Sequence, residues 1–391
     1  MKAEGKKRVI IIGASYGGLH AAKEFNKKDD FEVLVFDKKN FHYLQTEAYD
    51  FIANKSNISD ITIDIGTYIN KLSSNIKFVK EKVLEFDASQ QKIKTASNEY
   101  FYDYLIIATG ARTNFPSFIK GLRENSNGVK TLFRALGFKQ KFESTIYEYI
   151  TDNAFSHQRD YNIIIGGAGL SGVEIAAEMA YIIQTDFKRL GIRCLGFNIT
   201  LVDAAETILP GMDRRIIYAT IKRLKALGVH IKTKSFIKEV YPNELILNDG
   251  EKLPFDFMIF TGGIKAEPIA SQKEYKLNKF NQYIVDDLYN IENEKNIFAI
   301  GDVAYITADD TIIPPTAQSA EQSGTIVAKN IIKMAHNQEP IKKAPIIRGM
   351  FIALGGKYAV GTIYDKIVFK GYFAYLIKKF ITNFYKVFLK P

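Results

Sequence analysis

The sequence predicts an α/β protein, because one strand–turn–helix pattern occurs twice along the chain. The first copy, residues 8–18, reads RVIIIGASYGG, and the second, residues 162–174, reads NIIIGGAGLSGVE. In each copy a short apolar run leads into a glycine-rich turn, which is typical of a buried strand followed by a helix. A second apolar run then ends in an acid, VLVFD at Asp37 and ITLVD at Asp203.

The glycine-rich turns predict two dinucleotide sites. The first glycine permits the sharp turn, the next small residue lets the backbone approach a pyrophosphate, and the last glycine lets the helix pack against the strand. The phosphates would then lie at the helix N-terminus, where free N–H groups favour negative charge. The expected contacts are Gly13, Ser15, Gly17 and Gly18 in the first copy and Gly167, Gly169 and Gly172 in the second.

The acid after each second strand is expected to bind a ribose 2′-hydroxyl. Asp37 follows Gly13 by 24 residues, whereas Asp203 follows Gly167 by 36. We assign the additional residues to an extended helix end and loop over 185–198. The first copy departs from the usual fingerprint because Ser15 replaces its second glycine.

The repeat extends beyond the turns and divides the chain into units. Each unit is expected to continue with a small β-meander, over 75–102 and 231–253, and a closing strand. The closing strands end at Thr109–Gly110 and at Gly262. We predict a discontinuous first domain at 1–113 and 266–340, an inserted second domain at 114–265, and a separate segment at 341–391. A late buried strand ends at Gly301–Asp302, and a helix is expected from 316 to 336.

Composition excludes several classes of protein. The chain has 391 residues, which suits two or three domains. Its one cysteine, Cys194, permits no disulfide framework and no redox cysteine pair, so it argues against disulfide reductases and sulfide:quinone oxidoreductases. The five histidines show no metal-ligand spacing, and we predict no metal. We also expect neither a secretory signal nor a membrane-spanning helix.

Basic charge is concentrated at the C-terminus. Residues 342–391 contain ten basic residues and one acid, Asp365, against a net charge of +10 for the whole chain. Near the end, Lys378, Lys386 and Lys390 recur at helical spacing with Thr382. The opposite arc is apolar and contains Phe373, Leu376, Ile377, Phe380, Ile381, Phe384, Val387 and Phe388. This pattern favours a helix in a membrane interface, with its lysines toward anionic lipid.

Two alternatives for this helix are that its apolar face packs on the protein's own core or on a second subunit. Nucleic acid binding would leave the apolar arc unexplained, and the rest of the chain is nearly neutral. We therefore predict no nucleic acid partner.

Further motifs resemble a known family. The strand end ATG at 108–110, the inserted second unit and the late Gly301–Asp302 resemble the flavoprotein superfamily with two dinucleotide-binding domains. Within it, the chain is similar to type II NADH dehydrogenases, the single-subunit NADH:quinone oxidoreductases. The segment 314–322, PPTAQSAEQ, matches their Ala-Gln-x-Ala-x-Gln motif. Gln318 and Gln322 share one helix face, and an amide there can donate to a quinone carbonyl.

Two segments are less close to the family pattern. Residues 40–49, which include Gln45, are similar to the segment beside the flavin ring, but Thr46, Glu47 and Ala48 replace the common Pro-Leu-Leu. Residues 370–375, KGYFAY, are similar to Lys-Gly-x-x-Ala-Trp with Tyr375 in place of Trp. By resemblance, Lys370 lies near the flavin.

The resemblance implies FAD in the first unit and NADH in the second. The implied catalytic residues are Glu174, Gln318, Gln322 and Lys370. The implied FAD contacts are Gly13, Ser15, Gly17, Gly18, Asp37, Gln45, Thr109, Gly110, Gly301, Asp302, Ala317 and Gln318. The implied NADH contacts are Gly167, Gly169, Gly172, Glu174, Asp203 and Gly262. NADH would reduce FAD, which would reduce a membrane quinone without proton pumping, on the cytoplasmic face of the membrane. A homodimer is possible.

Two other functions fit the same architecture. One is a soluble reductase that passes electrons to a ferredoxin-like protein or to oxygen. The other is a redox-sensing binding protein of the apoptosis-inducing-factor type, which would hold NADH and signal through conformation. The paired glutamines favour the quinone reductase.

Overall fold

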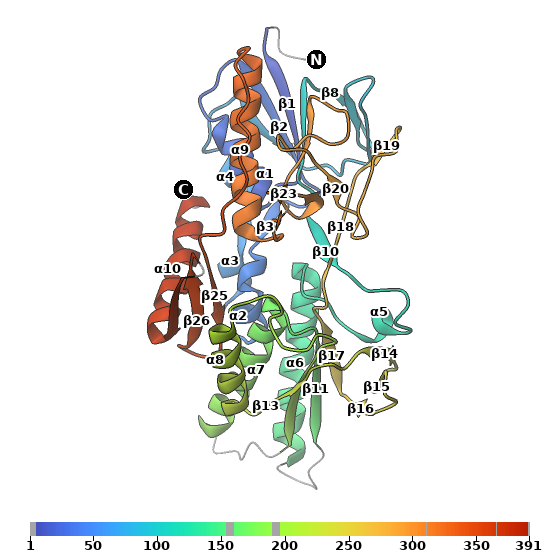
Figure 1. Cartoon of the computed structure of the whole chain (residues 1–391), viewed down its shortest axis with the longest axis vertical. Helices are drawn as coiled ribbons and strands as arrows, with labels where there is room; N and C mark the ends of the chain where they lie inside the picture. Colours follow the sequence, from blue (N-terminus) through green and yellow to red (C-terminus); the bar gives the residue numbers. More distant parts are fainter. Residues whose placement is uncertain (1–4, 154–159, 190–195, 310, 365, 390–391) are drawn as a thin grey trace.

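Two parallel sheets lie toward opposite ends of the molecule (Figure 1). The structure is a computed structural model that describes residues 5–153, 160–189, 196–309, 311–364 and 366–389. Cys194, Asp365 and Lys390, which enter the sequence argument, lie outside these residues. Both sheets show the α/β organisation that the repeated pattern predicts.

The first sheet has the strand order β21-β9-β1-β2-β5, with every neighbouring pair parallel. It takes strands from both ends of the first unit, because β21 comes from residues after the inserted unit. Its strands are β1 (Lys7–Ile12), β2 (Phe31–Phe36), β5 (Ile76–Val79), β9 (Tyr104–Ile107) and β21 (Ile297–Ala299).

The second sheet repeats this plan with the order β13-β12-β11-β17, again all parallel. Its strands are β11 (Tyr161–Gly166), β12 (Phe197–Val202), β13 (Val229–Lys232) and β17 (Phe257–Phe260). In both sheets the central strands are buried on both faces, which explains their unbroken apolar sequences.

Each predicted meander starts later than expected. The strands at 76–79 and 229–232 pair in parallel at the edge of the main sheets instead of joining the meanders. Their alternating sequences suit a half-buried edge strand as well as a meander strand, so periodicity alone does not separate the two. The meanders are β6 (Glu85–Asp87), β7 (Lys92–Lys94) and β8 (Glu99–Phe101), and β14 (Ile237–Val240), β15 (Glu244–Leu247) and β16 (Lys252–Pro254).

The main helices pack against these sheets. The helix α1 (Tyr16–Glu24) packs on α9 (Ala317–Ala335), which is capped by Thr316 and ends at His336 as the sequence predicts. In the second unit α7 (Leu170–Arg189) is 20 residues long against nine for α1, and this accounts for most of the wider spacing before Asp203. The other long helices are α6 (Leu132–Asn153) and α8 (Arg214–Ala226).

The chain crosses between the units through two strands that pair with each other. β10 (Ala111–Thr113) leaves the first unit, and β18 (Ile264–Ala266) returns antiparallel to it. The short elements are β3 (Phe41–Tyr43), η1 (Gln45–Glu47), α2 (Ala48–Ile52), α3 (Ile58–Ile61), β4 (Thr62–Asp64), α4 (Ile65–Ile69), α5 (Leu122–Asn125), β19 (Ala270–Ser271), β20 (Tyr283–Ile284), η2 (Gly301–Val303), β22 (Ala304–Tyr305), β23 (Thr307–Ala308) and β24 (Thr311–Ile312).

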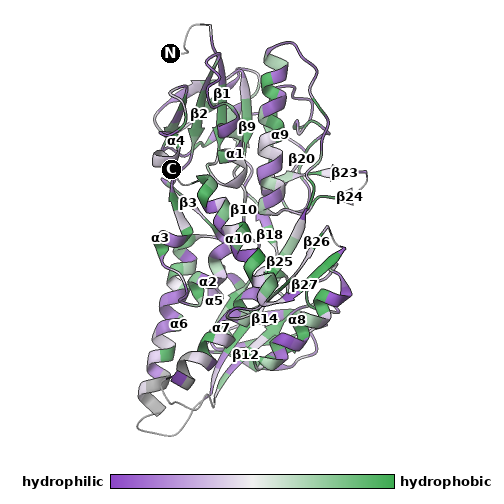
Figure 2. Ribbon diagram, turned by 90° about the vertical axis from the view of Figure 1, so that its left-hand side faces the viewer, coloured by the Kyte–Doolittle hydropathy of each residue, from purple (hydrophilic) through white to green (hydrophobic). Residues whose placement is uncertain are grey.

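The C-terminal segment contains a small sheet as well as the predicted helix. It forms an antiparallel sheet of β25 (Gly349–Ala353), β26 (Ala359–Ile363) and β27 (Ile367–Gly371), followed by α10 (Tyr372–Leu389). The sheet lies on the second unit, where Arg223 of α8 donates to the carbonyls of Leu354 and Gly355 at 2.9 and 3.2 Å. In Figure 2, α10 lies in front of the boundary between the two units.

We predict that Gly18→Ala destabilises the protein by about 1–3 kcal/mol, the usual cost of overpacking. A Cβ atom at Gly18 would overlap the carbonyl oxygen of Gly13, so helix α1 would have to move away from the strand. The free energy of unfolding in urea measures this. The matched control is Gly137→Ala in α6, where a Cβ meets no atom within 4 Å and alanine favours the helix. Equal stability of the two variants would contradict the close packing.

Candidate active site

A cavity of about 970 Å³ lies where the two units and α10 meet. Most predicted flavin contacts line it, namely Ser15, Gly17, Gln45, Thr109, Gly110, Gly301, Asp302, Ala317 and Gln318. The second unit contributes Leu170, Ser171, Glu174 and Ile175, and α10 contributes Ile377, Lys378, Ile381, Thr382, Phe384, Tyr385 and Phe388. Residues far apart in the sequence therefore line one cavity.

The first glycine-rich turn has the geometry of a phosphate cradle. Gly13 has a φ of +107°, and a Cβ there would overlap the carbonyl of Ala108. Asp37 lies beside the turn, and its Oδ2 accepts from the N–H of Ala14 at 2.9 Å. Ser15 and Gly17 at the start of α1 line the cavity, and the residues present fit a dinucleotide such as FAD.

The second turn has the same construction. Gly167 has a φ of +104°, and a Cβ at Gly172 would overlap the Gly167 carbonyl. Asp203 Oδ2 accepts from the N–H of Ala168 at 2.5 Å, as Asp37 does in the first unit. Gly169 faces open space, whereas Gly262 packs against the ring of Phe260. This turn also fits a dinucleotide.

The loop after β21 holds an ion pair that the motifs did not indicate. Asp302 Oδ2 lies 3.3 Å from Lys130 Nζ, and both residues line the cavity. The N–H of Gly301 donates to Ser323 Oγ of α9 at 3.2 Å. Lys130 stands alone in its sequence neighbourhood, so nothing in the sequence marked it as a site residue.

The paired glutamines bind the backbone of the segment 346–349. Gln318 Nε2 donates to the Gly349 carbonyl at 2.7 Å, and its Oε1 accepts from the N–H of Arg348 at 3.2 Å. Gln322 makes the corresponding pair with the backbone of Ile346, at 2.9 and 3.0 Å. The expected shared helix face is present, but only Gln318 lines the cavity. Both amides have a clear structural task.

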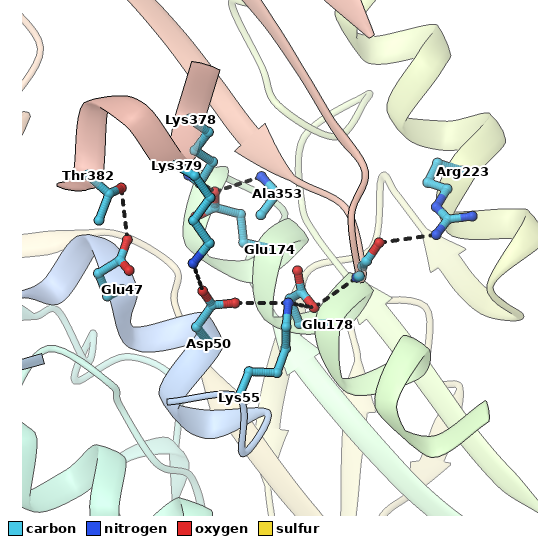
Figure 3. A network of polar contacts seen from close by, with 12 residues as sticks. Glu47, Asp50, Lys55, Glu174, Glu178, Arg223, Ala353, Lys378, Lys379 and Thr382 are labelled. Carbon is cyan, nitrogen blue, oxygen red and sulfur yellow. Dashed lines mark hydrogen bonds and ion pairs between the residues drawn. The ribbon is translucent and has the colours of Figure 1, made fainter. Parts of the chain in front are cut away.

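Glu174 of α7 is buried and paired with α10. Its Oε1 accepts from Lys378 Nζ at 2.6 Å and from the N–H of Ala353 at 3.0 Å (Figure 3). Burial raises the pKa of Glu174 above its ordinary value, although the charge of Lys378 opposes the rise. The sequence pointed to Glu174 but not to its partner Lys378.

A second buried ion-pair cluster lies next to this pair (Figure 3). Lys55 Nζ lies 3.0 Å from Asp50 Oδ1 and 2.8 Å from Glu178 Oε2, and Lys379 Nζ lies 2.9 Å from Asp50 Oδ2. Burial alone would raise the pKa of Asp50, but the charges of Lys55 and Lys379 outweigh it and lower the pKa. The cluster joins α2, α7 and α10.

Glu47 completes the contacts of α10 with the first unit. Its side chain is buried, with Lys386 Nζ 3.5 Å from Oε2 and the Thr382 hydroxyl 3.1 Å from Oε1. Glu47 also lines the cavity. The departure from Pro-Leu-Leu in this segment therefore places a carboxylate against α10.

The orientation of α10 corrects the predicted lipid contact of the lysines. Lys378, Lys379 and Lys386 point into the protein, because buried carboxylates pair with them. The apolar side chains Tyr372, Phe373, Leu376, Phe380, Ile381, Phe384 and Val387 are exposed instead. Ile377 and Phe388, assigned to the same apolar arc, line the cavity.

The expected position of Lys370 near the flavin is also wrong. Lys370 is an exposed residue of β27, paired in register with Val360, and it is not among the residues that line the cavity. The cavity lysine of this segment is Lys378, two turns into α10. Strand β27 was not recognised, and it turns the side chain away.

A third polar cluster lies where α1, β3 and α10 meet. Ser15 Oγ lies 3.1 Å from His42 Nδ1, and His42 Nε2 lies 3.0 Å from the Tyr385 hydroxyl. His20 stacks on Phe388 with ring centroids 4.4 Å apart. Isolated histidines carry no spacing signal, so the sequence did not indicate this cluster.

Comparison with known proteins identifies the class. The family model described as pyridine nucleotide-disulphide oxidoreductase matches residues 7–324, and the chain belongs to this family. This confirms the α/β fold, the oxidoreductase class and the FAD and NADH cofactors predicted from the sequence.

Individual relatives are more specific. The chain is 26% identical over 387 residues to a type II NADH:quinone oxidoreductase of Staphylococcus saprophyticus, which covers 97% of this chain and 95% of that protein. It is also 26% identical to the Staphylococcus aureus protein of that name, over 93% and 91% of the two chains. These matches confirm the resemblance seen in the motifs.

Solved structures share the fold. The NDH2 structure from Plasmodium falciparum in complex with NADH superposes with a TM-score of 0.85, at 18% identity, covering 99% of this chain and 95% of that one. The sulfide:quinone oxidoreductase of Aquifex aeolicus gives a TM-score of 0.82 at 21% identity, covering 98% and 91%.

We predict that Lys378→Met destabilises the protein by about 3–5 kcal/mol at pH 8, because it leaves Glu174 buried without its counter-ion. The loss should be smaller at pH 5. The pKa of Glu174 is higher in the folded protein than in the unfolded chain. As pH rises above the unfolded-state value, the unfolded chain loses its proton more readily than the folded protein does, so the free energy of unfolding falls. Urea unfolding at the two pH values measures this.

The control is the double variant Glu174→Gln/Lys378→Met, which removes both charges and should recover most of the stability. A pH-independent loss in Lys378→Met would contradict the pairing.

Proposed function

We propose that the protein is an NADH:quinone oxidoreductase of the type II class, which oxidises NADH and reduces a membrane quinone without moving protons across the membrane. The observation that carries the proposal is the single cavity bounded by the first glycine-rich turn, by Glu174 of the second unit and by α10. An electron donor and an acceptor can reach a flavin held in that space. The staphylococcal relatives bear this activity in their names.

The second unit favours NADH over NADPH. Asp203 lies at the end of β12, where a ribose 2′-hydroxyl is expected, and its carboxylate would repel a 2′-phosphate. The nearby Lys234 is paired with Glu206, at 3.3 Å. The charges at this edge therefore suit an unphosphorylated ribose.

The work of the chain is mainly positioning. When bound, FAD supplies the two-electron chemistry that links a hydride donor to a quinone. The two glycine-rich turns would hold the two dinucleotides by their phosphates, and α10 covers the space between the units with Ile377, Ile381 and Phe384. This apolar wall suits a quinone ring, and the single cysteine of the chain argues against a redox cysteine pair.

The exposed face of α10 supports membrane association. Phe380, Phe384 and Val387 are 70%, 66% and 69% exposed, and they form a continuous apolar strip with Phe373 and Leu376. Such a strip suits burial at the boundary between headgroups and acyl chains. Within the described residues, the structure has no helix long and apolar enough to cross a bilayer. We propose a peripheral enzyme that docks on the cytoplasmic face of the membrane through α10.

Anaerobic stopped-flow tests the proposed reaction. NADH should bleach the flavin absorbance of the full-length protein rapidly, and a short-chain ubiquinone or menaquinone analogue should then restore the colour. If NADH bleaches the flavin rapidly and its absorbance returns with a ferredoxin-like protein or oxygen but not with quinone, the result would favour the soluble reductase. Slow recovery with every acceptor would favour the redox-sensing protein.

Vesicle flotation tests the docking face. Phe380→Ser/Phe384→Ser should weaken partitioning into lipid vesicles by at least about tenfold, because each fully buried phenylalanine contributes about 1.5–3 kcal/mol. The matched control is Phe118→Ser, which removes a 73% exposed phenylalanine away from α10.

Since the three lysines of α10 are paired internally, binding to vesicles should persist at high salt and on uncharged lipid. The proposal would be contradicted if the unaltered protein did not float with vesicles. If the unaltered protein were then a dimer and the double variant a monomer, the strip would be the contact with a second copy of the chain.

A further inference from the structure

We propose that Glu321, with His20 as its partner, delivers to the quinone the proton that each turnover takes from solvent. The inference rests on the proposed function. The overall reaction is NADH + H⁺ + quinone → NAD⁺ + quinol, so the two electrons and one proton equivalent come from NADH and one proton comes from water. A group that lines the cavity and also reaches solvent is needed to supply it.

Glu321 and His20 meet this requirement by position. Both line the cavity, Glu321 from α9 and His20 from α1, and the Glu321 Oε2 lies 4.0 Å from His20 Nε2. Their side chains are 25% and 13% exposed, so water can reach the pair. The pair is therefore accessible both to water and to a ligand in the cavity.

The hydrogen bonding of His20 prepares it to face a carboxyl group. His20 Nδ1 lies 2.9 Å from the carbonyl oxygen of Tyr16, which can only accept, so Nδ1 carries the proton in the neutral ring. Nε2 is then left as an acceptor directed at Glu321. A protonated Glu321 can donate to it after a small side-chain rotation, which would hold a transferable proton at the cavity wall.

The other glutamates of the cavity are already committed. Glu174 is paired with Lys378 at 2.6 Å, and Glu47 contacts Lys386 and Thr382. The charge of Lys378 opposes protonation of Glu174, although burial raises the pKa of Glu174 overall. Glu321 has a neutral imidazole as its neighbour instead.

The charges around Glu321 allow it to carry a proton at neutral pH. Burial raises the pKa of Glu321 to about 7, and the charge of Arg348 in the 346–349 segment opposes the rise. Burial lowers the pKa of His20 to about 4, with Lys23 of α1 acting in the same direction. The other ionisable groups near the pair include the buried phenols of Tyr16 and Tyr385, whose pKa values are raised by burial. They also include the buried imidazole of His42, whose pKa burial lowers to about 3.

Reoxidation of the protein by quinone should depend on pH. Glu321 holds its proton below about pH 7 and loses it above. The rate at which quinone reoxidises the reduced protein should therefore fall as pH rises through this value. Reduction by NADH delivers a hydride and needs no proton from Glu321, so that rate should not share the pH dependence.

The test is stopped-flow on the full-length, FAD-loaded protein, on both sides of pH 7, with NADH and then a water-soluble quinone analogue. Glu321→Gln should slow reoxidation by quinone by about a hundredfold at acidic pH, a typical contribution of a general acid, and should abolish its pH dependence. Its reduction by NADH should match the unaltered protein. The control Glu339→Gln makes the same change at an exposed residue beyond α9 and should alter neither rate.

A second readout does not depend on turnover. Infrared titration of the oxidised protein without NADH or quinone should show a protonated carboxyl signal that is lost near pH 7 and is absent in Glu321→Gln. Glu321→Asp keeps an ionisable group and should retain a pH-dependent reoxidation rate, which separates proton delivery from a loss of packing.

The outcomes are distinct. If quinone does not reoxidise the unaltered protein, the proposed function fails and the inference fails with it. If quinone does reoxidise the unaltered protein, the inference alone is overturned by either of two results for Glu321→Gln. One is an unchanged reoxidation rate, and the other is a slower rate with the same pH profile. Absence of the infrared signal in the unaltered protein would also overturn it.

Discussion

The ion pairs between α10 and both nucleotide-binding units determine how the rest of the site is arranged. Lys378 is paired with Glu174 of α7, while Lys379 and Lys386 are paired with Asp50 and Glu47 of the first unit. Buried charges are costly unless they are paired, so these contacts leave the helix one favourable orientation. With its lysines inward, α10 closes the cavity and presents phenylalanines to the outside.

This arrangement makes one helix serve two surfaces. Ile377, Lys378 and Phe388 line the cavity, and Phe373 and Phe380 are exposed on the outside. Ile381 and Phe384 lie between these surfaces, because they line the cavity and are also exposed. A ligand that dissolves in lipid would meet the outer surface first and the cavity next. In the proposed orientation on a membrane, the helix that contacts lipid also forms one wall of the cavity.

The features predicted correctly from the sequence are local ones. The parallel strands follow from unbroken apolar runs and the two turns from glycine spacing, and α9 lies within the helix expected from 316 to 336. Each depends on residues close together in the chain. Several residues that line the cavity follow from these turns and strand ends, among them Ser15, Thr109 and Asp302, since the carboxyl ends of parallel strands meet at one edge of a sheet.

The features that were missed depend on partners far away in the chain. Helical periodicity established that α10 has a polar and an apolar face, but it does not say which face points inward. The answer lies in Glu47, Asp50 and Glu174, which precede α10 by some two hundred residues or more. Similarly, the shared face of Gln318 and Gln322 was predictable, whereas their partner segment 346–349 was not. Lys370 was misplaced because the strand before α10 was not recognised.

The paired crossing of β10 and β18 has a consequence for motion. A single linker would let the two units swing apart, but here two strands run side by side and share hydrogen bonds. Tyr49 and Ile52 of α2 extend from the first unit into the hydrophobic core of the second, which adds another point of attachment. Such a frame opposes hinge bending, so it favours a constant separation of donor and acceptor sites, with ligands exchanging through small local openings.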